Sequence, residues 1–220
     1  MTDKLEKIED FVYENIIKFT RYTDHLPHMA EFFKFYVPNN LLEWGLGYST
    51  KFFADKCSKV VSVEALSNFM QPSYYDFFKN ILQVLPNWNS VLWVVSDTIS
   101  EAVKYQIVEK KDPEKVDASY LSELQSYAQA LYSSENPDVV FVDSAIFING
   151  DLANTALANN IPFVIIHDSN EVSMCSYDKI VVPANYKTVE IKSGVGTTFF
   201  IRNDFEDIFN KMKVYSENLA

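Results

Sequence analysis

The sequence predicts an α/β protein built on a mostly parallel sheet. From residue 39 onward, short apolar stretches alternate with amphipathic helical stretches, which is the order of βαβ units. The apolar stretches are nearly continuous, as in strands that are covered on both faces of a sheet. Five of them end on a carboxylate, at Glu43, Glu64, Asp97, Asp143 and Asp168. Because the carboxyl ends of parallel strands meet at one edge, we expect these acids to line one cleft.

Each element is expected from its own pattern. An amphipathic helix is expected over 3–19 and an aromatic helix over 30–36, with a polar break at 21–29 between them. The segment 179–203 predicts two or three strands around a turn at Gly194 and Gly196, and the charged stretch 109–119 is predicted to be solvated. Strands are expected over 39–45, 59–65, 89–97, 138–144 and 161–168; helices are expected over 49–57, 68–85, 121–131, 151–160 and 204–215.

Composition limits the partners. The 220 residues suit one compact domain, and the net charge of -11 argues against broad contact with nucleic acid or an anionic membrane. No apolar run approaches the ~18 residues that span a bilayer, and the N-terminal stretch lacks the pattern of a signal peptide. We therefore expect a soluble, cytoplasmic protein. Cys57 and Cys175 are expected to be reduced core thiols, and the oligomeric state stays open.

Two of the five glycines lie in the segment Glu43-Trp44-Gly45-Leu46-Gly47-Tyr48-Ser49-Thr50. A strand, a G-x-G turn and a helix start let the backbone approach a ligand with free amide groups. A dinucleotide fingerprint would need a third glycine where Thr50 stands. Glu64 ends the next strand, from which an acid accepts both hydroxyl hydrogen bonds of a ribose. A nucleoside is thus favoured over a pyrophosphate; helix capping by these acids is the alternative.

The segment 41–65 resembles the first motif and second-strand acid of class I S-adenosylmethionine-dependent methyltransferases. It is similar to the subgroup whose motif reads E-W/F-G-x-G-x-S-T and whose fifth strand ends in His-Asp; the resemblance covers roughly residues 20–203. It implies a Rossmann-like three-layer sandwich with a mostly parallel seven-stranded sheet and an antiparallel C-terminal strand. It also implies an N-terminal helical segment and lid over 1–36 and a cofactor-binding domain over 37–220, within one compact unit.

The resemblance implies S-adenosylmethionine as cofactor and assigns its contacts. Glu43, Gly45 and Gly47 would hold the methionine part, Glu64 the ribose diol, and Asp97, with the backbone near Ser96, the adenine amine. The full set of expected cofactor residues is Glu43, Gly45, Gly47, Ser49, Thr50, Glu64, Ala65, Ser96, Asp97 and Asp143. S-adenosylmethionine is a cation that carries a diol and an amine, so it suits a cleft lined by carboxylates that accept hydrogen bonds.

Transfer to a hydroxyl also needs a base. Asp143, His167 and Asp168 are the candidates, and His167 has the most suitable ordinary pKa; a histidine that only hydrogen-bonds backbone is the alternative. Similar O-methyltransferases hold a magnesium-like ion with acids at these strand ends. Asp143, Asp168 and Asn170 offer oxygen ligands, but Ser169 interrupts the usual Asp-Asn pair, so the metal stays in doubt.

The leading hypothesis is transfer of a methyl group to an oxygen atom of a small-molecule acceptor. No N/D-P-P-Y/F motif follows the fourth strand, which disfavours methylation of nucleic-acid bases. Two alternatives stay open: an NAD(P)-type Rossmann oxidoreductase and a nucleoside-binding module without catalysis.

Overall fold

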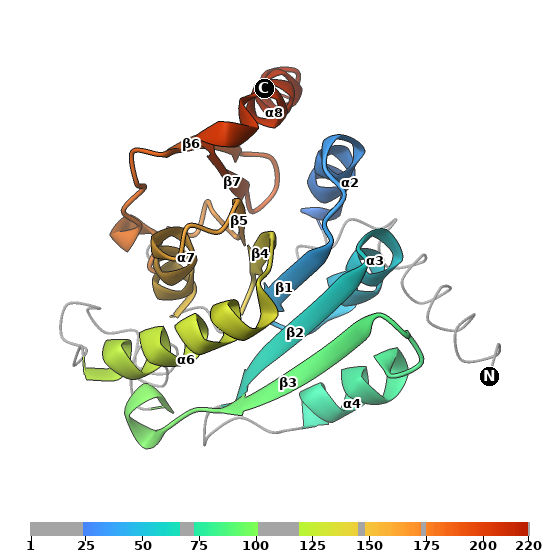
Figure 1. Ribbon diagram of the computed structural model, residues 1–220, viewed down its shortest axis with the longest axis vertical. Helices are drawn as coiled ribbons and strands as arrows, with labels where there is room; N and C mark the ends of the chain where they lie inside the picture. Colours follow the sequence, from blue (N-terminus) through green and yellow to red (C-terminus); the bar gives the residue numbers. More distant parts are fainter. Residues whose placement is uncertain (1–23, 67–72, 101–118, 145–147, 173–174, 220) are drawn as a thin grey trace.

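Seven strands form one sheet in the order β3-β2-β1-β4-β5-β7-β6 (Figure 1). The computed structural model describes residues 24–66, 73–100, 119–144, 148–172 and 175–219. The neighbouring strands β3, β2, β1, β4 and β5 pair in parallel, whereas β7 runs antiparallel to both β5 and β6. The predicted mostly parallel sheet with an antiparallel C-terminal strand is confirmed. The strands are β1 (Asn40–Trp44), β2 (Lys59–Leu66), β3 (Trp88–Val94), β4 (Val139–Val142), β5 (Phe163–His167), β6 (Tyr186–Ile191) and β7 (Thr197–Arg202).

Helices cover both faces of the sheet and complete three layers (Figure 1). One face is covered by α6 (Ser119–Glu135) and α7 (Asn149–Ala158), and the other by α2 (Leu26–Phe35), α3 (Tyr48–Lys56) and α8 (Glu206–Glu217). A further helix, α4 (Ser73–Leu82), packs beside β3. Among the described residues, no helix has the length and apolar character required to cross a bilayer.

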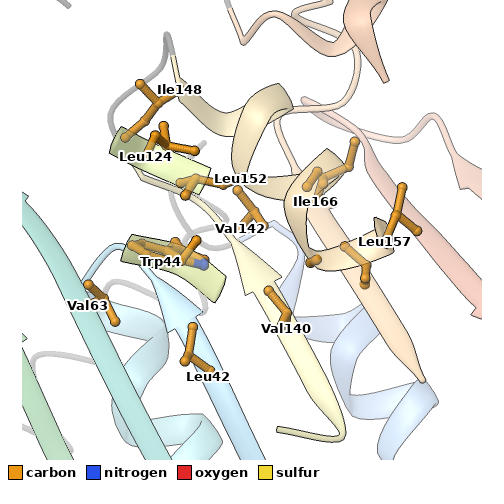
Figure 2. Close-up of a cluster of buried hydrophobic side chains, with 14 of the residues drawn as sticks. Leu42, Trp44, Val63, Leu124, Val140, Val142, Ile148, Leu152, Leu157 and Ile166 are labelled. Carbon is orange, nitrogen blue, oxygen red and sulfur yellow. The ribbon is translucent and has the colours of Figure 1, made fainter. Parts of the chain in front are cut away.

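Alternate residues of each strand enter two separate cores. In β4, Val140 and Val142 pack with Leu124 of α6 and Leu152 of α7 (Figure 2). The intervening Phe141 joins the core beneath α2, α3 and α8. Because side chains of a strand alternate between faces, this two-sided burial explains why the strands read as continuous apolar runs.

On the face of the sheet that α2, α3 and α8 cover, apolar side chains are followed by ionisable ones at the carboxyl ends of four strands. Along β4 and β5, the series of buried aromatic and aliphatic side chains gives way to Asp143 and His167. Along β1 and β2, the same face ends in Glu43 and Glu64. Residues two apart share a face, so these four ionisable side chains lie on the side of the sheet that α2 and α3 cover.

The start of α2 differs from the expectation for residues 21–29. Helix α2 begins at Leu26, inside the expected polar break, and Pro27 lies in its first turn. Proline is tolerated there because the first amides of a helix have no intrahelical partner. The helix expected over 3–19, the first residues of the helix expected over 68–85, and all but the last residue of the charged stretch 109–119 lie outside the described residues.

The connection from β5 to β6 contains little regular structure. Of its described residues, only Tyr177–Lys179 are helical, as a single 3₁₀ turn. Next to this connection, on the α7 side of the sheet, a groove of about 490 Å³ is lined by Ile166, Tyr177 and Phe200, with Lys192 among its polar lining residues. The described part of the connection thus leaves the β6–β7 hairpin partly uncovered on that side.

Candidate functional site

The turn after β1 requires a glycine at position 45. Gly45 has φ +98°, a conformation that side chains rarely adopt, and a Cβ atom there would lie 2.0 Å from the backbone oxygen of Asp143. Backbone hydrogen bonds on both sides fix the turn, from Gly45 N–H to Val63 O and from Asp143 N–H to Trp44 O, each 2.8 Å. The G-x-G segment therefore lies directly against the end of β4.

Helix α3 begins at the second glycine. Gly47 precedes the first turn of α3, and its N–H donates to Thr50 Oγ1 at 3.1 Å. A Cβ atom on Gly47 would come within 3.0 Å of the Tyr74 hydroxyl, so Tyr74 lies over this turn. Thr50, which stands where a dinucleotide motif would have its third glycine, is fully buried. The site thus has a backbone surface for a ligand but not the third glycine of a pyrophosphate loop.

Glu64 reaches the glycine turn from β2. Its Oε2 accepts the Leu46 N–H at 2.9 Å. Burial raises the pKa of Glu64 to about 7; the hydrogen bond from Leu46 opposes this rise and the nearby charge of Asp143 adds to it. The acid expected to bind a ribose therefore lies beside the G-x-G turn and close to Asp143.

Glu43 is enclosed beneath the same turn. Only 1% of its surface is exposed. Ser62 Oγ donates to it, and Thr50 also hydrogen-bonds to it. Burial raises the pKa of Glu43 to about 8, although both hydrogen bonds lower it; Asp143 and Glu64 raise it further. In this conformation Glu43 supports the turn from below, so a cation that came near would favour its ionised form.

His167 lies between two carboxylates at the end of β5. Its Nε2 is 2.8 Å from Asp24 Oδ1, and its Nδ1 is 3.2 Å from Asp143 Oδ2. Asp168 follows with φ +55°, a left-handed conformation that aspartate adopts more readily than most residues. One ligand atom from each of Asp143, His167 and Asp168 lies within 4.8 Å of the others. The structure thus brings the three expected catalytic residues together.

The charge of His167 differs from what its ordinary pKa suggested. Burial lowers its pKa, but hydrogen bonding to Asp143 and Asp24 and the nearby charge of Asp143 and Asp168 outweigh this and raise it to about 10. The ring is therefore protonated at neutral pH and has no lone pair for a proton. A raised pKa argues against His167 as the proton acceptor, and the choice among Asp143, His167 and Asp168 stays a prediction.

Two further histidines hold α2 in place. His25 Nε2 is 2.7 Å from Ser49 Oγ, and the His25 ring packs 4.2 Å from the His167 ring, centroid to centroid. Burial lowers the pKa of His25 well below its ordinary value, as does the charge of His167. His28 points elsewhere, to Tyr215 and Ser193, at 3.0 Å each. Ser49 is thus occupied by the N-terminal segment.

The expected adenine contacts lie beyond the end of β3. β3 ends at Val94, so Asp97 lies beyond the strand and is exposed. Ser96 Oγ donates to Glu123 of α6 at 2.6 Å and accepts the Ile99 N–H at 3.3 Å. Ala65 lies in the core beneath α6 and α7. The contacts of these side chains give no further support to their expected roles.

The Asn170 side chain, expected among the oxygen ligands, contacts the turn between β6 and β7. Its side-chain nitrogen donates to the backbone oxygens of Lys192 and Gly194, at 3.1 Å each, and its side-chain oxygen lies close to Gly196. Asn170 therefore holds the β6–β7 turn. Among the residues that the structure describes, two mixed groups of ionisable side chains have the spacing of metal ligands: Asp24, His25 and His167, and Asp143, His167 and Asp168. His167 would have to lose its proton to serve in either.

Sequence reasoning missed the roles of Asp24, Ser62 and Tyr177. Asp24 contacts His167, Ser62 contacts Glu43, and the Tyr177 hydroxyl donates to the His167 backbone oxygen at 2.6 Å. A serine within the apolar run of β2 and an acid beside two histidines were available signals. Tyr177 had none, because only the fold brings the β5–β6 connection back to the end of β5.

Comparison with solved structures identifies the architecture. The chain matches no protein-family model and no curated protein sequence. A provisionally assigned O-methyltransferase from Klebsiella pneumoniae is 15% identical, with a TM-score of 0.56 over 89% of this chain and 90% of the other. An SAH-bound methyltransferase from Podospora anserina is 11% identical, with a TM-score of 0.51 over 89% and 87% of the two chains. An O-methyltransferase from Bacillus cereus in complex with SAH is 15% identical, with a TM-score of 0.50 over 88% and 91%.

The fold is that of class I S-adenosylmethionine-dependent methyltransferases. Within this methyltransferase fold, the G-x-G turn, Glu64 and the Asp143–His167 pair occupy the carboxyl edge of the parallel strands. That edge is where open α/β sheets bind their ligands. The resemblance expected from the segment 41–65 is thereby confirmed at the level of the fold.

Proposed function

We propose that this protein transfers a methyl group from S-adenosylmethionine to an oxygen atom of a small-molecule acceptor. The observation that carries the proposal is the convergence of Glu43, Glu64 and Asp143 around the G-x-G turn. Glu43 and Glu64 have raised pKa values of about 8 and about 7, because burial and neighbouring acids disfavour their charges. A bound cation would relieve that repulsion, and S-adenosylmethionine carries positive charge on its sulfonium and amino groups.

The chemical groups of the residues around the turn suit S-adenosylmethionine. Gly45 and Gly47 are half-buried at the turn, and Glu64 places a carboxylate beside them that could accept from a ribose diol. When bound, S-adenosylmethionine supplies an activated methyl group. The protein's contribution is then to align the acceptor oxygen and to take its proton, for which Asp143 is proposed because 31% of its side chain is exposed.

The SAH-bound and O-methyltransferase neighbours favour this function over the alternatives. SAH is the product left when S-adenosylmethionine gives up its methyl group. The buried Thr50 in the third glycine position disfavours a nicotinamide dinucleotide. Net charge of -11 agrees with a small acceptor rather than a nucleic acid. The cytoplasmic location, the division at residue 36 and the adenine contacts of Ser96 and Asp97 stay predictions.

Calorimetric titration of the full chain tests the cofactor assignment. We expect SAH and S-adenosylmethionine to bind and to raise the melting temperature, and NAD to do neither. Binding of NAD without SAH would favour the oxidoreductase alternative. A panel of hydroxylated small molecules with methyl-labelled S-adenosylmethionine then tests transfer. Binding without labelled product from any acceptor would favour the nucleoside-binding module.

A further inference from the structure

Glu43 receives a hydrogen bond from the neighbouring strand. Ser62 lies directly opposite Glu43 in the parallel pairing of β1 and β2, and such partners point to the same face of a sheet. Both side chains are buried, with 1% of Glu43 and none of Ser62 exposed to solvent. Ser62 Oγ donates a hydrogen bond to Glu43 Oε1. The carboxyl group of Glu43 therefore has a fixed donor on the β2 side.

A third strand sets the direction of this hydrogen bond. Trp88, the first residue of β3, places its indole Nε1 2.7 Å from Ser62 Oγ. An indole N–H can only donate, so Ser62 is the acceptor in that contact. A serine hydroxyl carries one proton, and here that proton is left for Glu43. Trp88 thus orients Ser62, and Ser62 presents a donor to the carboxyl group.

A second hydroxyl group repeats the arrangement on the α3 side. Thr50 Oγ1 accepts the Gly47 N–H at 3.1 Å, which leaves the threonine proton for the hydrogen bond to Glu43. Both hydroxyl groups therefore donate to Glu43. A carboxylate is the form of this side chain that only accepts hydrogen bonds. The orientation of the two hydroxyl groups thus favours an ionised Glu43, although burial opposes it.

The ionised form has no positive partner in the described part of the chain. The charged neighbours that shift the pKa of Glu43 are two further acids, Asp143 and Glu64, and both raise it. A buried carboxylate without a cation is costly even when it accepts hydrogen bonds. A ligand with a positive group near the G-x-G turn would supply the missing charge. The hydrogen bonds from Ser62 and Thr50 would then be charge-assisted and stronger.

We propose that Ser62 and Trp88 are positioning residues of the cofactor site, which keep the Glu43 carboxylate charged and oriented beneath the G-x-G turn, where it attracts the amino group of the cofactor's methionine part. The inference rests on the function proposed above. Ser62 is fully buried, so it acts through Glu43 rather than on the cofactor. The Ser62 hydroxyl should therefore matter for ligands that carry the amino group and not for ligands that lack it.

Two ligands separate this role from general support of the fold. SAH carries the amino group, whereas 5′-methylthioadenosine keeps the nucleoside and the thioether but has no amino-acid part. In Ser62→Ala, we expect the calorimetric Kd for SAH to rise about 10-fold, because a hydrogen bond to a charged group is lost. The Kd for 5′-methylthioadenosine should change less than about twofold, because no contact with Glu43 is involved.

Trp88→Phe and the double variant test the direction of the contacts. Phenylalanine keeps a ring but removes the donor that orients Ser62, so we expect the Kd for SAH to rise about threefold. Once Ser62→Ala has removed the hydroxyl group, Trp88→Phe should have no further effect on that Kd. The matched control is Ser90→Ala. Ser90 lies opposite Ser62 on β3 and pairs with the Tyr75 hydroxyl at 3.0 Å, so both Kd values should equal those of the wild type.

Equal weakening of both ligands in Ser62→Ala would overturn the inference, since the hydroxyl group would then support the site as a whole. Unchanged affinity for SAH would do the same, and so would full additivity of Ser62→Ala and Trp88→Phe. If Ser62→Ala does not fold, the comparison of the two ligands in Trp88→Phe decides in the same way. Failure of the proposed function has a different signature, in which the wild type itself binds neither SAH nor S-adenosylmethionine.

Discussion

Gly45 packs directly against the backbone of Asp143, so the cofactor turn and the proposed catalytic strand end are in contact. The carbonyl oxygen of Asp143 would lie 2.0 Å from a Cβ atom on Gly45, a separation that no side chain tolerates. The two positions are 98 residues apart in sequence, and their contact couples the geometry of the proposed methyl donor site to that of the proposed proton acceptor.

Gly45→Ala should therefore destabilise the protein strongly. The positive φ and the steric overlap together should lower the free energy of unfolding by about 3 kcal/mol, as measured by urea denaturation. Gly47→Ala is the matched control, because its φ is -173° and its added Cβ would meet, among the described residues, only the Tyr74 hydroxyl, at 3.0 Å. Equal stability losses in the two variants would contradict the assigned packing.

Glu64→Gln should weaken cofactor binding without unfolding the turn. Glutamine can still accept the Leu46 N–H, but the charge that strengthens hydrogen bonds to ribose hydroxyls is lost. A charge-assisted bond contributes about 1.5–3 kcal/mol, so we expect a roughly 10- to 150-fold rise in the calorimetric Kd for SAH. Glu190→Gln, an exposed acid on β6, should leave the Kd unchanged. Wild-type affinity in Glu64→Gln would remove the ribose assignment.

Glu43→Gln should change how stability depends on pH. The folded-state pKa of Glu43 is raised from 4.5 to about 8, chiefly by burial. Below pH 4.5 both states hold the proton. Between pH 4.5 and 8 only the folded state does, so the free energy of unfolding falls by up to about 1.4 kcal/mol per pH unit from this group. We expect Glu43→Gln to flatten that decline in urea denaturation series.

The comparison isolates Glu43 because other titrating groups are common to both proteins. His167, with its pKa raised to about 10, gives stability that is fully present below about pH 6.5 and is lost as the pH rises through 10. That contribution should appear unchanged in the variant. Parallel curves for wild type and Glu43→Gln between pH 4.5 and 8 would refute the raised pKa.

Asp143→Ala should abolish turnover and leave cofactor binding nearly intact. Removal of a positioned base typically costs about 10²- to 10⁴-fold in rate, whereas the backbone of Asp143 that supports the G-x-G turn remains. His167→Ala should also lose turnover, because the positive charge beside Asp143 is then lost. Steady-state rates and the Kd for SAH check both. Asp178→Asn, an exposed acid in the β5–β6 connection, is the control, and wild-type rates in both active-site variants would place the chemistry elsewhere.

Chelation should leave methyl transfer largely intact. Asn170 holds the β6–β7 turn through its amide nitrogen, and Asp143 already faces the positively charged His167. A divalent ion would have to displace that charge. We expect the initial rate to change less than about twofold between 1 mM EDTA and 1 mM Mg²⁺. If activity depended on a metal ion bound by oxygen ligands, the rates under these two conditions would differ greatly. A strict requirement for Mg²⁺ would show that the strand ends rearrange around a metal.

The strand sequence and the glycine turn were predictable because their signals are local. Apolar runs, the spacing of Gly45 and Gly47 and the acid at Glu64 each follow from backbone conformation within one or two elements. The pairing of Asp24 with His167 could not be read in this way, since it depends on where α2 begins and on the turn at Val195. Proline at position 27 indicated a break, but it stands in the first turn of a helix.

The charge state of His167 was the other property that could not be predicted from the sequence. An isolated histidine titrates near neutrality, and only the tertiary fold shows that His167 has a carboxylate at each nitrogen. Likewise, Ser96 follows a strand as expected, yet its hydroxyl turns toward Glu123 of α6. Side-chain direction beyond a strand end is set by neighbours that are distant in the chain.

The irregular connection between β5 and β6 is a suitable place to insert a peptide tag. Val181 is 76% exposed and lies in a stretch without helix or strand, on the opposite side of the sheet from the histidines. Exposed loop backbone of this kind accepts inserted sequence more readily than packed elements do. An epitope tag or a fluorophore-labelling peptide placed beside Val181 would report on the folded protein while leaving the glycine turn and its acids untouched.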